Sequence, residues 1–344
     1  KNEAPPPVTA NRAKYFAENI KDKEWCNFSL KTNYLDRVPA AIEPVRKTLR
    51  DFKPAIVVVD PKVYEGVIAC ELERIPWITL SPSLTMVSPE YLKTDLSATV
   101  NWFSTERDKL FLSHNVAAKF RFTDCLSSIH NLCFTTDELI GNVNLPDIKR
   151  IGPSLPAGDR GDECDFPWKK LDDRVPVVYV NLGTQTFWQP GIMRNLMSAV
   201  RDREVQLVCS VSALYDTLAN EFVPSNVILV RDAPQLSLLP AMAAFVSHGG
   251  ASSVMESIAL GVPLIVCPFY DDQSHQAHFV DKCGVGQRQD LSNMDPDECW
   301  RALQFVLESP RIKETVAKVQ FSYKKYDGAN EAARIISRLA SRRD

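Results

Sequence analysis

Short runs of consecutive apolar residues alternate with helical stretches along most of the chain. Residues 55–60 (Ala-Ile-Val-Val-Val-Asp) are apolar at successive positions, which is typical of a parallel strand covered on both faces. An amphipathic helix is predicted before this run, over residues 37–51, and residues 64–73 and 76–80 predict a helix and the next strand. This strand–helix–strand order indicates a parallel α/β fold.

The alternation is clearer in the second half of the chain. Helices are predicted over residues 193–200 and 250–260, with Gly261 just past the end of the second. The predicted strands are residues 177–182, 205–209, 226–230, 242–247 and 263–267. We expect two α/β domains with doubly wound parallel sheets, at residues 1–150 and 177–320. They are joined by a Gly-, Pro- and Asp-rich linker at 151–176.

Composition narrows the possible function classes. The 344 residues include 40 Lys and Arg against 43 Asp and Glu, so a net charge of -3 gives no electrostatic support for nucleic-acid binding. The sequence has no apolar run long enough for a membrane-spanning helix. The nine cysteines are scattered without a C-x-x-C pair, which favours reduced thiols in a cytoplasmic protein.

Candidate chemistry is concentrated where the predicted strand 242–247 meets the next helix. The turn 248–250 is His-Gly-Gly, and two glycines allow a ligand to approach the backbone closely. Ser252 and Ser253 fall in the first helical turn, where free N–H groups and the helix dipole favour an anion such as phosphate. Glu256 lies on the same helix face as Ser252 and suits the diol of a ribose. A Gly-Gly turn can also be purely structural.

Polar side chains follow three more predicted strands. Thr184 follows the strand at 177–182, Gln235 follows 226–230, and an Asp-Gln pair at 272–273 follows 263–267. Because ligands of open parallel sheets bind beyond the carboxyl ends of the strands, these side chains predict one crevice. Its mixture of hydroxyl, amide and carboxylate groups suits a nucleotide sugar.

This part of the chain resembles the donor-binding signature of family-1 glycosyltransferases. The matching residues are Pro234-Gln235, Leu238-Leu239, Ser247-His248-Gly249-Gly250, Ser253, Glu256, Gly261-Val262-Pro263, Pro268 and Asp272-Gln273. The resemblance implies a GT-B fold, in which two Rossmann-like domains face a cleft. Residues 1–150 would bind the acceptor, 177–320 the donor, and a carboxy-terminal helix at 321–344 would pack back on the first domain.

The resemblance also implies the activity and the site residues. The activity is inverting transfer of a sugar from a UDP-sugar to a hydroxyl of a small-molecule acceptor, such as a natural product, a phenol or a lipid-like compound. The implied contacts are His248, Gly249, Gly250, Ser252, Ser253 and Thr184 for the diphosphate, Glu256 for the ribose, Ala233 and Gln235 for the base, and Asp272 and Gln273 for the sugar.

The first domain departs from the family pattern. Family members carry a general-base His in an opening Gly-rich loop, and no His of this chain has that context. We therefore expect the amino-terminal part of the acceptor domain to be missing, and assign to Asp60 only the role of orienting that His. Trp102, Phe103, Phe111 and Phe120 either line an acceptor pocket or belong to the core.

No cofactor is expected, because the UDP-sugar is a co-substrate and no D-x-D motif for a metal stands at a predicted strand end. His275 and His278 lie three residues apart but have no further ligand at usable spacing. Glu256 favours UDP over dTDP, since only UDP carries both ribose hydroxyls. The alternatives are a GT-B UDP-GlcNAc epimerase, a lipid-linked sugar transferase, and a nucleotide-sugar-binding protein without catalytic activity.

Overall fold

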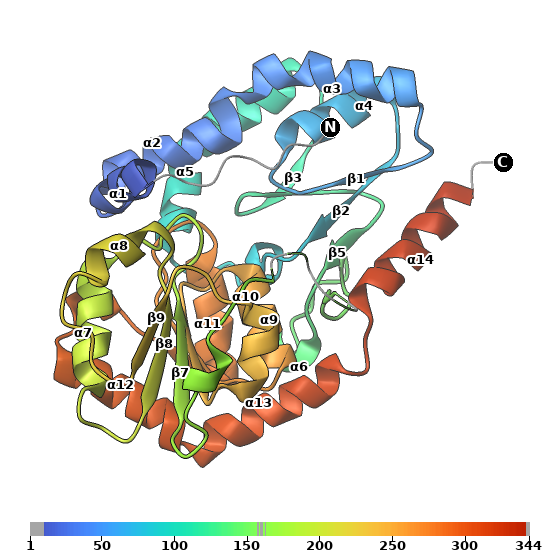
Figure 1. Ribbon diagram of the computed structural model, residues 1–344. Helices are drawn as coiled ribbons and strands as arrows, with labels where there is room; N and C mark the ends of the chain where they lie inside the picture. Colours follow the sequence, from blue (N-terminus) through green and yellow to red (C-terminus); the bar gives the residue numbers. More distant parts are fainter. Residues whose placement is uncertain (1–9, 157, 159–160, 162, 342–344) are drawn as a thin grey trace. The chain divides into compact units, whose positions relative to one another are not determined.

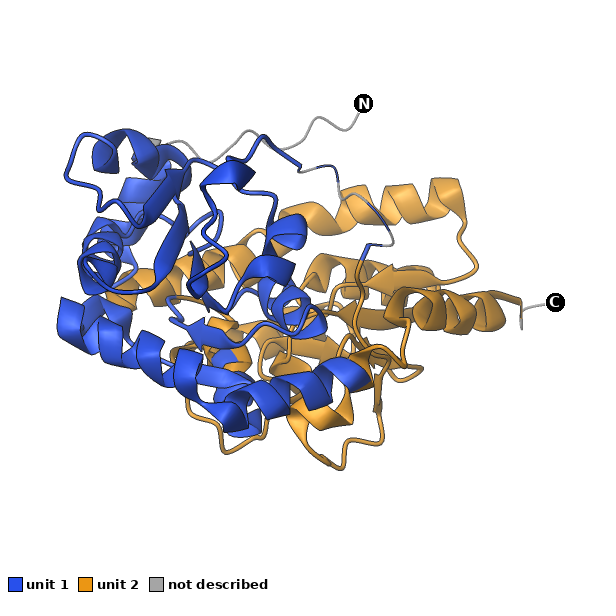
Figure 2. Cartoon of the chain, turned by 60° about the horizontal axis from the view of Figure 1, so that its bottom comes forward, with its two compact units in different colours: residues 1–21, 156–269, 277–321 blue, residues 22–155, 270–276, 322–344 orange. Residues whose placement is uncertain are grey.

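The computed structural model describes residues 10–156, 158, 161 and 163–341. These residues divide into two compact units (Figure 2). Within the described residues, unit 1 comprises the ranges 10–21, 156–269 and 277–321, and unit 2 comprises the ranges 22–155, 270–276 and 322–341. Residues 157, 159–160 and 162 of the expected linker lie outside the described residues.

Unit 1 is built on a parallel six-stranded sheet of order β12-β11-β10-β7-β8-β9 (Figure 1). Its strands are β7 (Val177–Asn181), β8 (Gln206–Ser210), β9 (Val227–Val230), β10 (Ala244–Ser247), β11 (Leu264–Val266) and β12 (Gly286–Arg288). The central strands are almost entirely buried, since helices cover the sheet and leave no polar face. Tyr179 and Phe245 stack across β7 and β10, with ring centroids 4.9 Å apart.

Local signals in the sequence explain where the helices of unit 1 begin. Asp295 and Glu298 form a reciprocal capping box at the start of α12, and Pro296 occupies its first turn. The helices assigned mainly to this unit are α1 (Ala10–Asn19), α7 (Pro190–Val200), α8 (Tyr215–Leu218), α9 (Gln235–Leu238), α10 (Ala251–Ala259), α11 (Gln273–Cys283), α12 (Pro296–Glu308) and α13 (Pro310–Tyr323).

Unit 2 contains a smaller parallel sheet of order β1-β2-β5-β6 and an antiparallel pair. The strands of the sheet are β1 (Val57–Val59), β2 (Trp77–Ser81), β5 (Asn131–Cys133) and β6 (Ile148–Arg150), and the pair is β3 (Lys119–Arg121) with β4 (Asp124–Leu126). Within the described residues β1 pairs only with β2, and Val58 is 40% exposed. The expectation that this strand is covered on both faces was therefore wrong for Val58, because β1 is an edge strand of the described sheet.

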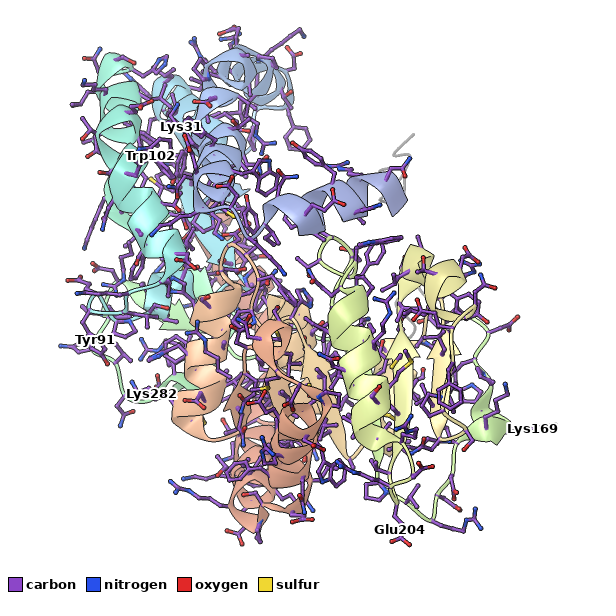
Figure 3. The ribbon with its side chains drawn as sticks, turned by 90° about the vertical axis from the view of Figure 1, so that its left-hand side faces the viewer. Lys31, Tyr91, Trp102, Lys169, Glu204 and Lys282 are labelled. Carbon is purple, nitrogen blue, oxygen red and sulfur yellow. The ribbon has the colours of Figure 1, made fainter. Side chains whose placement is uncertain are left out.

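The core of unit 2 lies between this sheet and its helices. Phe103 and Phe111 of α5 are buried, and Phe111 packs edge-on against Tyr64 and Phe120, so these aromatic residues belong to the core. Trp102, on the other side of α5, is half-exposed and contacts Phe28 (Figure 3). The helices are α2 (Lys23–Lys31), α3 (Val38–Phe52), α4 (Tyr64–Glu73), α5 (Asp95–Ser113), α6 (Asp137–Ile140) and α14 (Gly328–Ala340).

Candidate functional site

The end of strand β7 starts a polar network in unit 1. The side chain of Asn181 accepts a hydrogen bond from the Gly183 backbone (2.8 Å) and donates one to the Tyr179 hydroxyl (3.0 Å). It also donates to Gln235 Oε1 at 3.4 Å. Asn181 therefore connects the stacked core of the sheet to the loops at its carboxyl edge. Asn181 is not among the residues predicted from the sequence, although its position at a strand end was a signal.

Gln235 and Glu256 form the buried part of this network. Gln235 Nε2 donates to Glu256 Oε2 at 2.6 Å, and it lies 3.4 Å from Ser253 Oγ. Glu256 is only 4% exposed and Gln235 only 7%. A buried carboxylate is unfavourable without hydrogen-bond donors, and the Gln235 amide supplies one. The structure thus brings together the residues expected at the base and at the ribose.

The His-Gly-Gly turn follows β10 with close packing around the imidazole. Gly249 has a φ of +88°, which favours glycine, and its N–H donates to Ser247 Oγ at 3.2 Å. A methyl group added at Gly183 or at Gly250 would lie 2.6 Å from His248 Nε2. The two glycines therefore make the room that the imidazole occupies.

Burial also sets the charge of this imidazole. It lowers the pKa of His248 to about 4, although the backbone carbonyl of Asn181 favours the protonated form. The ring is therefore neutral near pH 7 and donates a hydrogen bond from only one of its nitrogen atoms.

Helix α10 presents its amino terminus at the same turn. Gly250 is the N-cap and provides no side-chain hydrogen bond, so the backbone N–H groups of the first turn are not capped by that residue. Ser252 is exposed and Ser253 half-buried within this turn. Backbone N–H groups at a helix start attract anions, so this turn is the candidate anion site of unit 1.

Two further expected site residues lie in adjoining loops of unit 1. Thr184 follows Gly183 in the loop after β7 and is exposed. Ala233 is half-buried, two residues before Gln235. Thr184 is therefore adjacent in sequence to a glycine that packs against the imidazole, and Ala233 is close in sequence to the Gln235 of the network.

The structure places the remaining expected residues in unit 2. Asp60 directly follows β1; it is exposed, and its side chain accepts a hydrogen bond from the Lys62 backbone at 2.9 Å. Asp272 and Gln273 belong to segment 270–276, which groups with unit 2 although the chain on either side belongs to unit 1. Gln273 is buried, and its Oε1 accepts a hydrogen bond from the Tyr270 backbone at 3.1 Å.

A charged cluster that was not predicted from the sequence surrounds this segment. Lys62 forms an ion pair with Asp271 at 3.2 Å, and the hydroxyl of Tyr34 donates to the same carboxylate at 2.5 Å. Asp124, at the start of β4, is fully buried, and the positive charge of Lys62 lowers its pKa. Residues so distant in sequence give no local pattern that predicts their contact.

His275 has a structural environment in the same segment. Its Nδ1 lies 2.8 Å from Ser88 Oγ and its Nε2 lies 3.1 Å from Thr94 Oγ1. The edge of Phe122 covers the ring. Among the described residues, no group of three or more His, Cys, Asp or Glu side chains is arranged to hold a metal ion.

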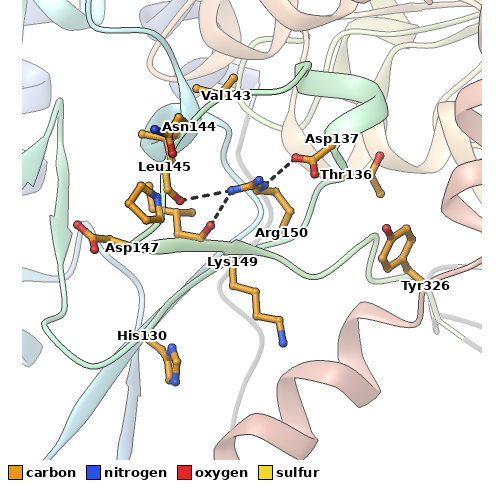
Figure 4. A pocket seen from close by; sticks show the side chains of 12 residues that line it. His130, Thr136, Asp137, Val143, Asn144, Leu145, Asp147, Lys149, Arg150 and Tyr326 are labelled. Carbon is orange, nitrogen blue, oxygen red and sulfur yellow. Dashed lines mark hydrogen bonds and ion pairs between the residues drawn. The ribbon is translucent and has the colours of Figure 1, made fainter.

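A separate pocket of about 480 Å³ opens beside β6 (Figure 4). Arg150 donates from Nε to Asp137 Oδ1 at 2.8 Å and from Nη1 to the carbonyl oxygen of Ile148 at 2.9 Å. Lys149 pairs with Glu331 of α14 at 2.5 Å. Because both cations have partners within the unit, this pocket is a poorer candidate than the β7–β10 edge.

Two further properties of the described residues concern membrane spans and cysteines. No helix in the described ranges combines the length and apolarity needed to cross a bilayer. Within these ranges none of the nine cysteines forms a disulfide bond, and only Cys164 is exposed.

Comparisons with known proteins show what this part of the chain is similar to. Residues 176–325 match the family model described as UDP-glucoronosyl and UDP-glucosyl transferase. The chain is 32% identical over 183 residues to an NDP-glycosyltransferase of Bacillus subtilis, covering 53% of this chain and 46% of that protein. It is 34% identical over 185 residues to an anthocyanidin 3-O-glucosyltransferase of Gentiana triflora, covering 50% and 39%. The chain thus spans about half the length of the curated relatives it matches.

Solved structures agree in fold over a larger share of the chain. The glycosyltransferase of kitacinnamycin superimposes with a TM-score of 0.76 at 20% identity, covering 97% of this chain and 85% of that one. The calicheamicin glycosyltransferase CalG4 gives 0.72 at 19% identity, covering 95% and 89%. The expected α/β class and GT-B architecture are confirmed, and the matched family model and relatives support the resemblance of residues 176–325 to family-1 glycosyltransferases.

Proposed function

We propose that the protein transfers a sugar from a UDP-sugar to a hydroxyl group of a small-molecule acceptor, with inversion at the anomeric carbon. The observation that carries the proposal is the junction of β10 and α10. An uncapped helix start, a neutral half-buried His248 and the buried Gln235–Glu256 pair lie together at one sheet edge. An anion site beside an acceptor for two ribose hydroxyls matches the two ends of a nucleoside diphosphate.

The proposed chemistry needs no metal ion. The acceptor oxygen attacks the anomeric carbon while the bond to the diphosphate breaks. The leaving diphosphate gains negative charge, which the N–H groups of the first turn of α10 and a hydrogen bond from His248 stabilise. Ser252, Ser253 and Thr184 add hydroxyl donors, and Asp272 and Gln273 hold the sugar.

The acceptor hydroxyl must lose its proton to a general base, and such assistance typically contributes 10²- to 10⁴-fold. We assign Asp60 as the residue that orients a base His, and no residue of this chain as the base itself. The exposed carboxylate of Asp60 at the end of β1 supports this role.

Uridine is proposed over thymidine because of Glu256. A carboxylate gains two hydrogen bonds from a ribose diol but only one from a deoxyribose. A dTDP-sugar is the second candidate donor, since the structural neighbour VinC was crystallised in complex with dTDP and superimposes with a TM-score of 0.63.

Isothermal titration of the chain with UDP and with dTDP tests the proposal. We expect UDP to bind more tightly, and Glu256→Gln to weaken UDP binding about tenfold while it weakens dTDP binding less. Glu221→Gln is the matched control, because Glu221 forms an exposed ion pair with Arg194 in the same unit. Release of UDP from UDP-glucose, assayed with a panel of phenols and polyols, then tests the transfer.

Three results would contradict the proposal at different levels. Absence of UDP binding would remove the donor site itself. Tight binding of UDP without release of UDP from any donor and acceptor pair would leave a nucleotide-sugar-binding protein. A clear preference for dTDP would contradict only the role of Glu256.

A further inference from the structure

Asp271 immediately precedes the two residues proposed to hold the donor sugar, and both of its carboxylate oxygen atoms are engaged. The Tyr34 hydroxyl donates to Oδ2 at 2.5 Å, and Lys62 Nζ lies 3.2 Å from Oδ1. In sequence, Tyr34 precedes Asp271 by 237 residues and Lys62 precedes it by 209 residues. All three residues belong to unit 2.

The partners of Asp271 are themselves held in place. Tyr34 lies in a π-helical turn, Thr32–Asp36, and is only 9% exposed. The side chain of Lys62 is 15% exposed, and its ammonium group lies 5.5 Å from the centre of the Tyr34 ring. A cation over an aromatic face adds attraction between the two donors. The arrangement is therefore a compact three-residue clamp: Tyr34, Lys62 and Asp271.

The positive charge of Lys62 and the negative charge of Asp271 compensate each other in a poorly solvated environment. Burial by itself lowers the pKa of Lys62, but the charges of Asp271, Tyr34, Asp272 and Asp124 together outweigh this effect and raise the pKa well above its ordinary value. Lys62 is therefore a permanent cation. A buried or half-buried charge that loses its partner is strongly destabilised, so Lys62 holds Asp271 in place.

The backbone of Asp271 shows what the clamp controls. Its φ is +53°, in the left-handed region that non-glycine residues rarely adopt and that costs them roughly 1 kcal/mol. Directly after this bend the Asp272 carbonyl accepts the backbone N–H of His275 at 2.9 Å. The bend at Asp271 thus sets the direction in which the following two side chains leave the loop.

We propose that Tyr34 and Lys62 are positioning residues for donor-sugar recognition, because through Asp271 they fix the loop that presents Asp272 and Gln273 to the sugar. This inference rests on the proposed function. Residues 176–325 match the family model, and they include Asp271. The proposed determinants of sugar selectivity, Tyr34 and Lys62, lie outside this stretch. The class of ligand affected is the hexose of the nucleotide sugar and not its nucleotide.

The test separates affinity for the sugar from affinity for the nucleotide. Tyr34→Phe and Lys62→Met are titrated with UDP, UDP-glucose and UDP-galactose. We expect the affinity for UDP to stay within about twofold, and the preference for one hexose over the other to fall roughly tenfold, the equivalent of a lost charged hydrogen bond. Lys47→Met is the matched control, since Lys47 pairs with Asp51 on an exposed helix face.

Substitutions at Asp271 distinguish the bend from the clamp. Glycine adopts a positive φ without cost, so Asp271→Gly keeps the bend and loses the clamp, whereas Asp271→Ala loses both. We expect Asp271→Ala to reduce selectivity more than Asp271→Gly. Adding Tyr34→Phe to Asp271→Gly is expected to cause no further loss, because the two residues act through one contact.

The outcomes bear separately on the two proposals. If the unaltered chain binds neither UDP nor UDP-sugars, the proposed function fails. If it binds and discriminates sugars, but the folded variants keep the same selectivity, the clamp inference alone is overturned. A melting curve for each variant verifies folding, and Tyr34→Phe, which removes one oxygen atom, remains informative if Lys62→Met does not fold.

Discussion

A single buried carboxyl group, that of Asp124, shows how strongly one residue depends on its surroundings. Thr123 donates to its Oδ1 at 3.0 Å, whereas its Oδ2 has no hydrogen-bond partner among the described residues. Burial raises the pKa of Asp124 to about 7, Lys62 opposes this effect, and Asp60 and Asp272 add to it. The folded protein therefore favours the neutral acid.

The stability of the folded state therefore depends on pH through Asp124. Because the pKa of Asp124 rises from 3.8 to about 7, the folded state holds the proton more tightly. This contribution to stability is complete below pH 3.8 and is lost as the pH rises through about 7. Asp124→Asn, which stays neutral, is expected to raise the melting temperature by roughly 5 °C at pH 8 and by much less at pH 4.5.

Thermal unfolding by calorimetry at the two pH values measures this difference. Asp202→Asn is the control, since that side chain is 91% exposed. An equal gain for Asp124→Asn at both pH values would show that the carboxyl does not change its protonation between them.

At the scale of elements, the start of α10 joins the fold to the candidate site. The strand β10, the glycine turn and the helix were all predicted, because a short apolar run, two glycines and a helical pattern are local signals. Strand β12 was not predicted, because its sequence Gly-Gln-Arg is polar at two of three positions. It also missed the clamp, because the contact of Tyr34 and Lys62 with Asp271 depends on tertiary structure alone.

A methyl group at position 250 is expected to disturb this junction. It would lie 2.6 Å from His248 Nε2, so Gly250→Ala must displace the imidazole. We expect UDP affinity to fall about tenfold, with little change in stability, because the φ of -61° suits alanine. Gly191→Ala in α7 is the control, since no atom lies within 4 Å of its added methyl group. Titration with UDP measures both variants, and unchanged binding in Gly250→Ala would remove His248 from the anion site.

At the scale of the whole molecule, the last helix of the chain belongs to unit 2. Ala332 and Ile335 of α14 pack with Ile78, Leu132 and Ile151 in one cluster. The carboxy-terminal helix is therefore part of the core around the smaller sheet and does more than cover its surface.

Truncation of Ile335 measures this contribution. The side chain is 7% exposed, so Ile335→Ala is expected to lower the free energy of unfolding by about 2–4 kcal/mol. Arg338→Ala, at an exposed position of the same helix, should change it by less than about 0.5 kcal/mol. Chemical denaturation with urea compares the two variants. Similar values for both would mean that α14 contributes little to the core.

The division into units also constrains how segments of this fold can be exchanged with those of related proteins. Segment 270–276 groups with unit 2 but lies between two stretches of unit 1, so neither unit is a continuous piece of sequence. A chimera that exchanged residues 156–321 as one block would import a foreign residue at position 271 while it retained Tyr34 and Lys62. Block exchange among relatives should therefore succeed more often when the incoming block carries an acidic residue there, or when positions 34 and 62 are exchanged together with it.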